Sequence, residues 1–109
     1  MFTDAEKIIM IKTAIALRLL LGRNKGYSEN NKSDIIDSYE KIAINSNADL
    51  RKATVTNAFS GRKRSSMVTI TLIVESMGFT MFDFGEQYCK VNDEHISEFQ
   101  NSILGKSHN

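Results

Sequence analysis

The segment spanning residues 50–61 combines side chains that could bind an anion with side chains that could contact a base edge. Read as a helix, it presents two cations, two hydroxyls, an amide and one small residue, with no carboxylate on that face. These residues are Arg51, Lys52, Ala53, Thr54, Thr56 and Asn57. Lys can donate to guanine and Asn can form two hydrogen bonds with adenine, while the lack of acids avoids repulsion by phosphates. The segment therefore has the chemistry of a helix that enters the major groove of duplex DNA.

Three consecutive cations, Arg62, Lys63 and Arg64, follow this segment directly. They are suited to neutralising phosphates where the chain leaves the groove, and the helix N-terminus would add amide donors and a partial positive charge. The alternative interpretation is a solvated amphipathic helix followed by a basic loop, which small domains also carry.

Charge is distributed unevenly along a chain whose net charge is only +1. Residues 1–64 contain 12 Lys and Arg against 7 Asp and Glu, whereas residues 65–109 contain 2 against 6. This asymmetry favours a protein with one anion-facing surface and an acidic C-terminal part that stays away from the anion.

The chain contains few residues suited to catalysis or metal binding. A single cysteine, Cys89, excludes an intrachain disulfide and a cysteine-based zinc site, and we interpret it as a small apolar filler. Asp93, Glu94 and His95 are adjacent, so on a helix they would point in different directions instead of converging on a metal. No phosphate-binding glycine loop, nucleophile elbow or HExxH motif is present, and the sequence predicts neither an enzyme nor a metal or other cofactor.

The elements that would position the central segment are all predicted to be helices. The chain has no Pro and no Trp, is 41% hydrophobic and 25% charged, and its length of 109 residues suits one domain. We expect helices over about residues 4–21, 33 or 38 to 45, 50–60, 67–77, 81–91 and 93–104, with residues 105–109 loose. A strand over 81–91 fits less well, because Asp83 and Gly85 would interrupt its alternation.

Residues with known capping chemistry mark the expected helix boundaries. Thr3 and Glu6 have the spacing of a capping box. The other expected boundaries are a stop at Gly22, a stop at Asn45–Asn47, a cap at Asp49, a stop at Gly61, a cap at Ser65 or Ser66, a stop at Gly78, a cap at Thr80 and a cap at Asn92 or Asp93.

Apolar spacing predicts which helix faces are buried. In the first helix one face carries Ile8, Ile11, Ala14, Ile15 and Leu19, while Met10, Leu17, Leu20 and Leu21 lie off it, so the helix could bury more than one side. In the central segment, the residues expected in the core are Leu50, Val55, Ala58 and Phe59. Two alternatives remain for the apolar residues toward the C-terminus, which could pack in the core or form a dimerisation element. These residues are Met81, Phe84, Tyr88, Val91, Ile96, Phe99 and Ile103.

The apolar stretch from Ile8 to Leu21 does not indicate a membrane segment. Lys12 and Arg18 interrupt it, and it is shorter than the ~20 residues that a membrane span needs. Acidic residues precede it, which is not the order of a secretory signal. We expect a cytoplasmic protein with no membrane association.

A spaced set of residues between Ser38 and Phe79 resembles the lambda-repressor/Cro-like helix-turn-helix family of the xenobiotic response element type. The residues that carry this resemblance are, in order, Ile42–Ala43, Val55, Ala58, Gly61, Ile70, Ile73 and Met77–Gly78. The resemblance covers about residues 7–84 and implies an all-α, compact five- to six-helix bundle. Residues 85–104 would form a C-terminal helical extension of this bundle. Relative to the family, the turn over 44–49 is about two residues longer, residues 29–37 look inserted, and Ser65 occupies a place where Pro is frequent.

The resemblance also implies roles for single residues. The recognition helix would span about Leu50–Ser60, and the residues on and around it would contact either bases or phosphates. The base-facing residues would be Lys52, Ala53, Thr56 and Asn57, and the phosphate-facing residues would be Ser38, Arg51, Thr54, Arg62, Lys63 and Arg64.

A repressor-like transcriptional regulator that binds a specific site on double-stranded DNA is the function that the family resemblance implies. Two half-sites about one helical turn apart (~34 Å) would require a homodimer. The alternative is a protein-interaction module on the same scaffold, such as an antitoxin that binds a toxin or an assembly subunit.

Overall fold

The computed structural model describes residues 2–31, 35–46 and 50–107. Among these residues it contains six α-helices and no strand, which confirms the predicted all-helical fold. The helices are α1 (Asp4–Asn31), α2 (Tyr39–Asn45), α3 (Lys52–Ser60), α4 (Met67–Ser76), α5 (Met81–Lys90) and α6 (Asp93–Ser107). The segment 81–90 is therefore helical, and residues 105–107, which we expected to be loose, belong to α6.

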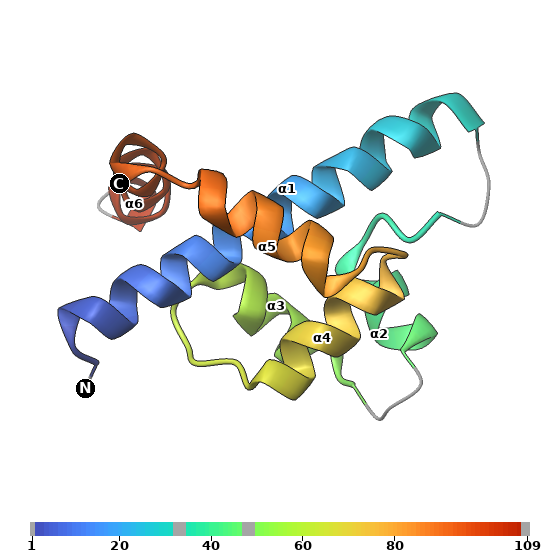
Figure 1. Ribbon diagram of the computed structural model, residues 1–109, viewed down its shortest axis with the longest axis horizontal. Helices are drawn as coiled ribbons and strands as arrows, with labels where there is room; N and C mark the ends of the chain where they lie inside the picture. The colour runs from blue at the N-terminus through green and yellow to red at the C-terminus, as the bar shows by residue number, and fades with distance from the viewer. Residues whose placement is uncertain (1, 32–34, 47–49, 108–109) are drawn as a thin grey trace.

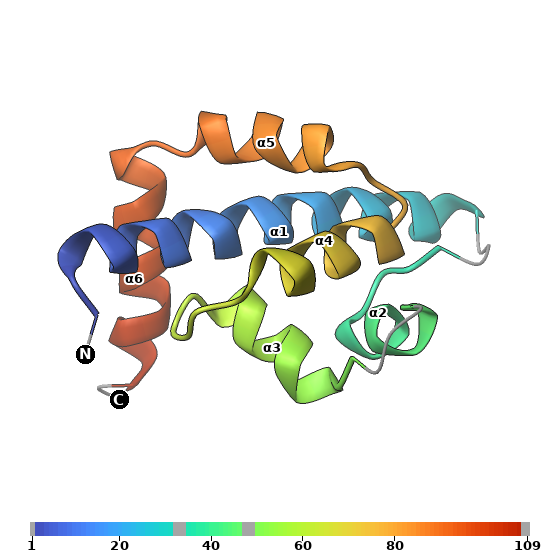
Figure 2. The same ribbon diagram turned by 60° about the horizontal axis from the view of Figure 1, so that its bottom comes forward.

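The long helix α1 is the central element around which the others are arranged (Figure 1). It packs against α3, α5 and α6, while α2 packs against α3 and α4, and α4 packs against α5. Figure 2 shows α5 on one side of α1 and α2, α3 and α4 on the other, with α6 crossing near the N-terminal end of α1. The molecule has principal dimensions of 38 × 30 × 29 Å.

Helix α1 continues past Gly22, and the expected stop there is wrong. Its start is as predicted, since Thr3 Oγ1 accepts from the Glu6 amide and Glu6 Oε1 accepts from the Thr3 amide, at 3.1 and 2.9 Å. Gly22 does not adopt a positive φ, and α1 runs on to Asn31. Burial of Leu20 and Leu21 before Gly22 and of Asn24 after it ties both sides of the glycine to the rest of the protein. Tertiary packing therefore outweighs the modest cost of a glycine within a helix.

The predicted stripe of α1 is buried only in part, at Ile11 and Ala14. Burial of Met10, Leu17, Leu20 and Leu21 confirms that the helix buries more than one side. Ile8 and Leu19 are each 45% exposed, whereas Ala16, Leu17 and Leu20 are fully buried. Because α1 contacts α3 and α5 on different sides, it buries a wide surface instead of a single narrow one.

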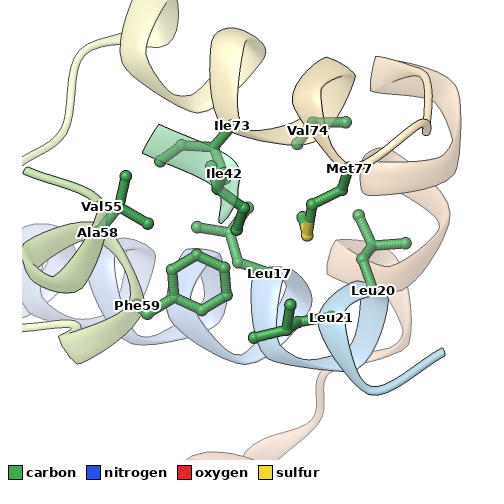
Figure 3. Packing of buried hydrophobic residues seen from close by; sticks show 10 residues of the cluster. All are labelled: Leu17, Leu20, Leu21, Ile42, Val55, Ala58, Phe59, Ile73, Val74 and Met77. Atoms are coloured by element: carbon green, nitrogen blue, oxygen red, sulfur yellow. The ribbon is translucent and has the colours of Figure 1, made fainter. Parts of the chain in front are cut away.

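The hydrophobic core lies between α1, α2, α3 and α4 (Figure 3). Its buried members are Leu17, Leu20, Leu21, Ile42, Val55, Ala58, Phe59, Ile73, Val74 and Met77. The predicted inward residues of α3 are confirmed, with Leu50 partly buried against the same cluster. Met81 and Phe84 of α5 also pack against it and Val91 is buried, which agrees with a core role for these three residues. The side chain of Ile103 lies outside the described part of the structure.

Most helix starts are set by the predicted side-chain caps. The hydroxyls of Ser38, Ser66 and Thr80 accept from amides three residues later, and Thr80 and Asp83 form a capping box. Asn92 Oδ1 accepts from the His95 amide at 2.9 Å ahead of α6. The expected cap at Asp49 lies outside the described residues, as does a helix start at Ser33.

Helices α3 and α4 also differ at one end from their predicted ranges, and α5 ends one residue earlier than predicted. Helix α3 begins at Lys52, two residues later than expected, because Arg51 is extended (φ −82°, ψ 149°) and offers no side-chain cap. Helix α4 ends at Ser76 and is followed by Met77 and Gly78, whose φ of 91° turns the chain.

Side-chain amides join helices that lie far apart in the sequence. The buried Asn24 Nδ2 donates to the carbonyl oxygens of Ile36 and Met77 at 2.8 and 2.9 Å. Asn45 Nδ2 donates to the Ser76 carbonyl at 3.1 Å, and the Ser76 hydroxyl donates to the Ile42 carbonyl at 3.0 Å. These bonds fix α2 and α4 relative to each other and to α1.

Among the described residues, no single helix has both the length and the apolarity needed to cross a bilayer. Only α4 and α5 taken together reach that threshold, as a pair bent by 105°.

Replacing Gly61 and Gly22 by alanine should change the free energy of unfolding in opposite directions. Gly61 has φ +71°, and a Cβ there would lie 3.3 Å from Phe99, so Gly61→Ala should lower the free energy of unfolding. We expect a loss of about 1–2 kcal/mol. Gly22 is helical with open space around it, so Gly22→Ala should raise stability by about 0.5–1 kcal/mol. Urea denaturation measures both, and destabilisation by Gly22→Ala would contradict a continuous α1.

Removing the amide of Asn24 should cost more than removing that of Asn45. Asn24→Ala leaves two carbonyls without their donor, one buried and one partly buried, for a loss of about 2–3 kcal/mol. Asn45→Ala removes one partly buried bond and should cost about 1 kcal/mol. Thermal and urea unfolding of the two variants check this order, and equal losses would show that the Asn24 bonds do not persist in solution.

Candidate nucleic-acid interface

Helix α3 has one face in the core and one face in solvent. Val55, Ala58 and Phe59 are buried, whereas Lys52, Ala53 and Thr56 are exposed, and Thr54 and Asn57 are half-buried. Figure 2 places α3 at the outer edge of the bundle, on the far side from α5. All four residues predicted to face bases are therefore brought together on one accessible side of one helix.

The C-terminal end of α3 is held in place by contacts from α1 and α2. The Arg18 Nε donates to the Phe59 carbonyl oxygen at 2.8 Å, and the same guanidinium lies 4.8 Å from the centre of the Phe99 ring. The rings of Tyr39 and Phe59 have centroids 4.5 Å apart. In the sequence, Arg18 is visible only as a cation within an apolar run, and this is the one local signal of its role.

The exposed polar side chains of α3 differ in how far they are already engaged. The Thr56 hydroxyl donates to the Lys52 carbonyl at 2.9 Å, so its oxygen is left as an acceptor. Within the described part of the chain, the side chains of Lys52 and Asn57 form no hydrogen bond or ion pair. These two side chains can therefore meet an external partner without breaking an internal bond.

Cations lie at both ends of α3. Arg51 and Lys52 are exposed at its start, and Arg62 and Lys63 are exposed just after its end. In the described residues, none of these four side chains forms an ion pair. A helix of nine residues is about 14 Å long, which is close to the ~12 Å width of the major groove. The two pairs therefore lie at opposite ends of this helix.

Arg64 is separated from the other cations by its contacts with the N-terminal segment. Its guanidinium forms an ion pair with Glu6 and lies 5.0 Å from the centre of the Phe2 ring. The structure therefore gives this predicted phosphate-facing residue an acidic partner, which nothing in the local sequence indicated because the pair is separated by 58 positions.

Ser38 lies near the start of α3 but already has a structural role. Its hydroxyl caps α2 by accepting from the Lys41 amide at 3.2 Å. Ser38 and Lys52 line one shallow hollow, which also contains the carboxylates of Asp37 and Glu40. The beginning of α2 is consequently less cationic than the two ends of α3.

The chain offers no competing site of metal chemistry in its described residues. No group of three His, Cys, Asp or Glu side chains converges there. His95 Nδ1 accepts from the Asn92 amide at 3.2 Å as part of the α6 cap, and Cys89 is exposed without a disulfide partner.

No protein-family model, curated protein or solved structure matches the chain.

The ion pair between Glu6 and Arg64 should depend on pH. The Thr3 amide holds the pKa of the Glu6 carboxyl below its ordinary value of 4.5, with the Thr3 hydroxyl and Arg64 acting in the same direction. Because the folded pKa is the lower one, this stabilisation is present above pH 4.5 and is lost as the pH falls through the folded pKa. NMR titration of the Glu6 carboxyl should give a depressed midpoint that rises in Arg64→Gln. An unchanged midpoint in that variant would show that the two side chains do not pair in solution.

Proposed function

We propose that this protein is a sequence-specific double-stranded DNA-binding regulator with a lambda-repressor/Cro-like helix-turn-helix, in which α3 enters the major groove. The observation that carries the proposal is the exposed face of α3. It joins a free Lys and a free Asn to hydroxyl groups, contains no carboxylate, and is flanked at both ends by unpaired cations. Those are the donors and charges that base edges and phosphates require.

The arrangement of α1 to α4 supports a helix-turn-helix. Helix α2 packs against α3 and α4, and Ile42 on α2 is buried in the same cluster as Val55 on α3. Helices α1 and α4 hold this pair through hydrogen bonds, from Arg18 on α1 to the Phe59 carbonyl of α3 and from Asn45 on α2 to the Ser76 carbonyl of α4. A helix held this firmly can be presented to DNA without a large loss of conformational entropy on binding.

The exposed residues divide into two roles under this proposal. Lys52, Ala53, Thr56 and Asn57 face bases, with Ala53 small enough to touch a thymine methyl. The phosphate-facing residues are Ser38, Arg51, Thr54, Arg62, Lys63 and Arg64. Of these, Arg64 has to exchange Glu6 for a phosphate and Ser38 already caps α2, so we assign them smaller contributions than Arg62 and Lys63.

Regulation would follow from occupancy of the operator. A cytoplasmic homodimer would place two copies of α3 in successive major grooves about one helical turn apart (~34 Å) and block or recruit polymerase. No cofactor is required for this mechanism.

The alternative function is protein interaction, and exposed apolar side chains favour it. Met67 and Val68 at the start of α4 are 70% and 68% exposed, and Phe82 on α5 is 75% exposed. A toxin or another protein partner could cover them.

Selection of bound duplexes from a random DNA pool tests the base-facing residues. Wild type should enrich a symmetric motif, and Lys52→Ala and Asn57→Ala should each relax one position in each half-site, at roughly 1–3 kcal/mol per lost contact. The matched control is Lys90→Ala, an exposed cation on α5 that should leave the motif unchanged. A folded protein that enriches nothing at low salt would instead support the interaction module.

Phosphate contacts should produce a different signature, which appears in the salt dependence of DNA affinity. Arg62→Ala should weaken binding to all sequences alike and reduce the slope of log affinity against log salt by about 1, because one fewer counterion is released. Fluorescence anisotropy over a salt series measures this slope. An altered motif with an unchanged slope would place Arg62 against a base and contradict its assignment.

A further inference from the structure

A surface hollow lies beside the end of α3, between the N-terminal segment, α1 and α6. Its volume is about 290 Å³, near the lower end for small-molecule sites. Its apolar lining comes from Phe2, Met10, Ile11 and Phe99. Met10 and Ile11 are nearly buried, so they form the floor and leave little polar surface there.

Close packing around Gly61 fixes the shape of this hollow. A Cβ at Gly61 would lie 3.3 Å from the Phe99 ring and 3.4 Å from the Ala14 Cβ, so the loop after α3 approaches both α1 and α6. The guanidinium of Arg18 also lies near this ring, 4.8 Å from its centre. The apolar wall is therefore built by residues that other contacts already restrain.

Among the described residues, the charged side chains that line this hollow have a single sign. Lys7 and Arg62 line it, and no carboxylate from the described part of the chain does. By contrast, each of three other surface hollows includes at least one acid. These acids are Glu98 between α1 and α6, Asp37 and Glu40 near α2, and Glu86 on α5.

We propose that this hollow binds a small apolar carboxylate of the straight-chain fatty acid type. An apolar tail would displace water from Met10, Ile11 and Phe99, and the carboxylate would reach Lys7 and Arg62 at the edge. A simple inorganic anion would leave the apolar walls uncovered, and a neutral alkane chain would leave the two cations unused. Charge and polarity together therefore select this class of ligand.

Arg62 connects the hollow to the nucleic-acid interface. If α3 binds DNA as proposed above, the same guanidinium serves a phosphate in one complex and a carboxylate in the other. The ligand should then lower DNA affinity, and DNA should lower ligand affinity by the same factor.

Ligand binding is tested first without DNA, using decanoate below its micellar concentration as the probe and decanol as its uncharged counterpart. Methyl NMR spectra should show saturable shifts at Met10 and Ile11 with decanoate. Lys7→Gln combined with Arg62→Gln should weaken decanoate binding by roughly tenfold or more while leaving decanol binding unchanged. The matched control is Lys63→Gln, which removes an exposed cation that does not line the hollow. Thermal unfolding confirms that these surface variants remain folded.

Two results would overturn the site. The first is that decanoate shifts methyl NMR signals elsewhere but not those of Met10 or Ile11. The second is that the affinity for decanoate is the same in the double variant as in Lys63→Gln. The link to DNA is tested separately by anisotropy, where decanoate should weaken DNA binding of wild type more than that of Lys7→Gln. Absence of DNA binding with saturable decanoate binding would refute the proposed function alone. DNA binding without decanoate binding would refute the ligand site alone.

Discussion

Burial of Phe59 against α1 and α2 is the constraint on which the candidate interface depends. Its side chain is fully buried, its ring lies against Tyr39, and its carbonyl oxygen accepts from Arg18. Helix α3 has only nine residues, so anchoring Phe59 together with Val55 determines which side of the helix faces solvent. A rotation of α3 would expose this aromatic ring, at a cost of about 1.5–3 kcal/mol in lost burial alone, and would also turn Lys52 toward the core.

The turn after α3 joins the two proposed binding surfaces. Gly61 allows the chain to turn in the left-handed region and to pass close to Phe99, which shapes the hollow between α1 and α6. Arg62, the next residue, is exposed both at the end of α3 and at the edge of that hollow. Arg64 is instead drawn toward Glu6, so the three consecutive cations are not equivalent. The local pairing of each charge matters more here than the net charge of +1.

Much of the local structure could be predicted because its causes lie within a few residues of one another. A hydroxyl at Ser38, Ser66 or Thr80 satisfies an amide three positions later, so these helix starts follow from the sequence. The inward face of α3 follows from apolar spacing, and its opposite face, with Lys52 and Asn57, follows with it. The polar chemistry of the candidate interface was therefore available from the residues themselves.

What only the tertiary structure decided involves residues far apart in the chain. Helix α1 passes Gly22 because Asn24 is buried and bonded to carbonyls up to 53 positions away, which no local propensity encodes. Its exposed face could not be assigned from periodicity, because α1 packs against three helices, α3, α5 and α6, and buries more than one side. The pairing of Arg64 with Glu6 and of Arg18 with the end of α3 likewise spans 58 and 41 positions. The sequence alone thus determined the local helix signals and the chemistry of α3. The burial of α1, the state of each cation and the hollow beside Arg62 were decided by packing, because those energies arise between elements that meet only in the folded chain.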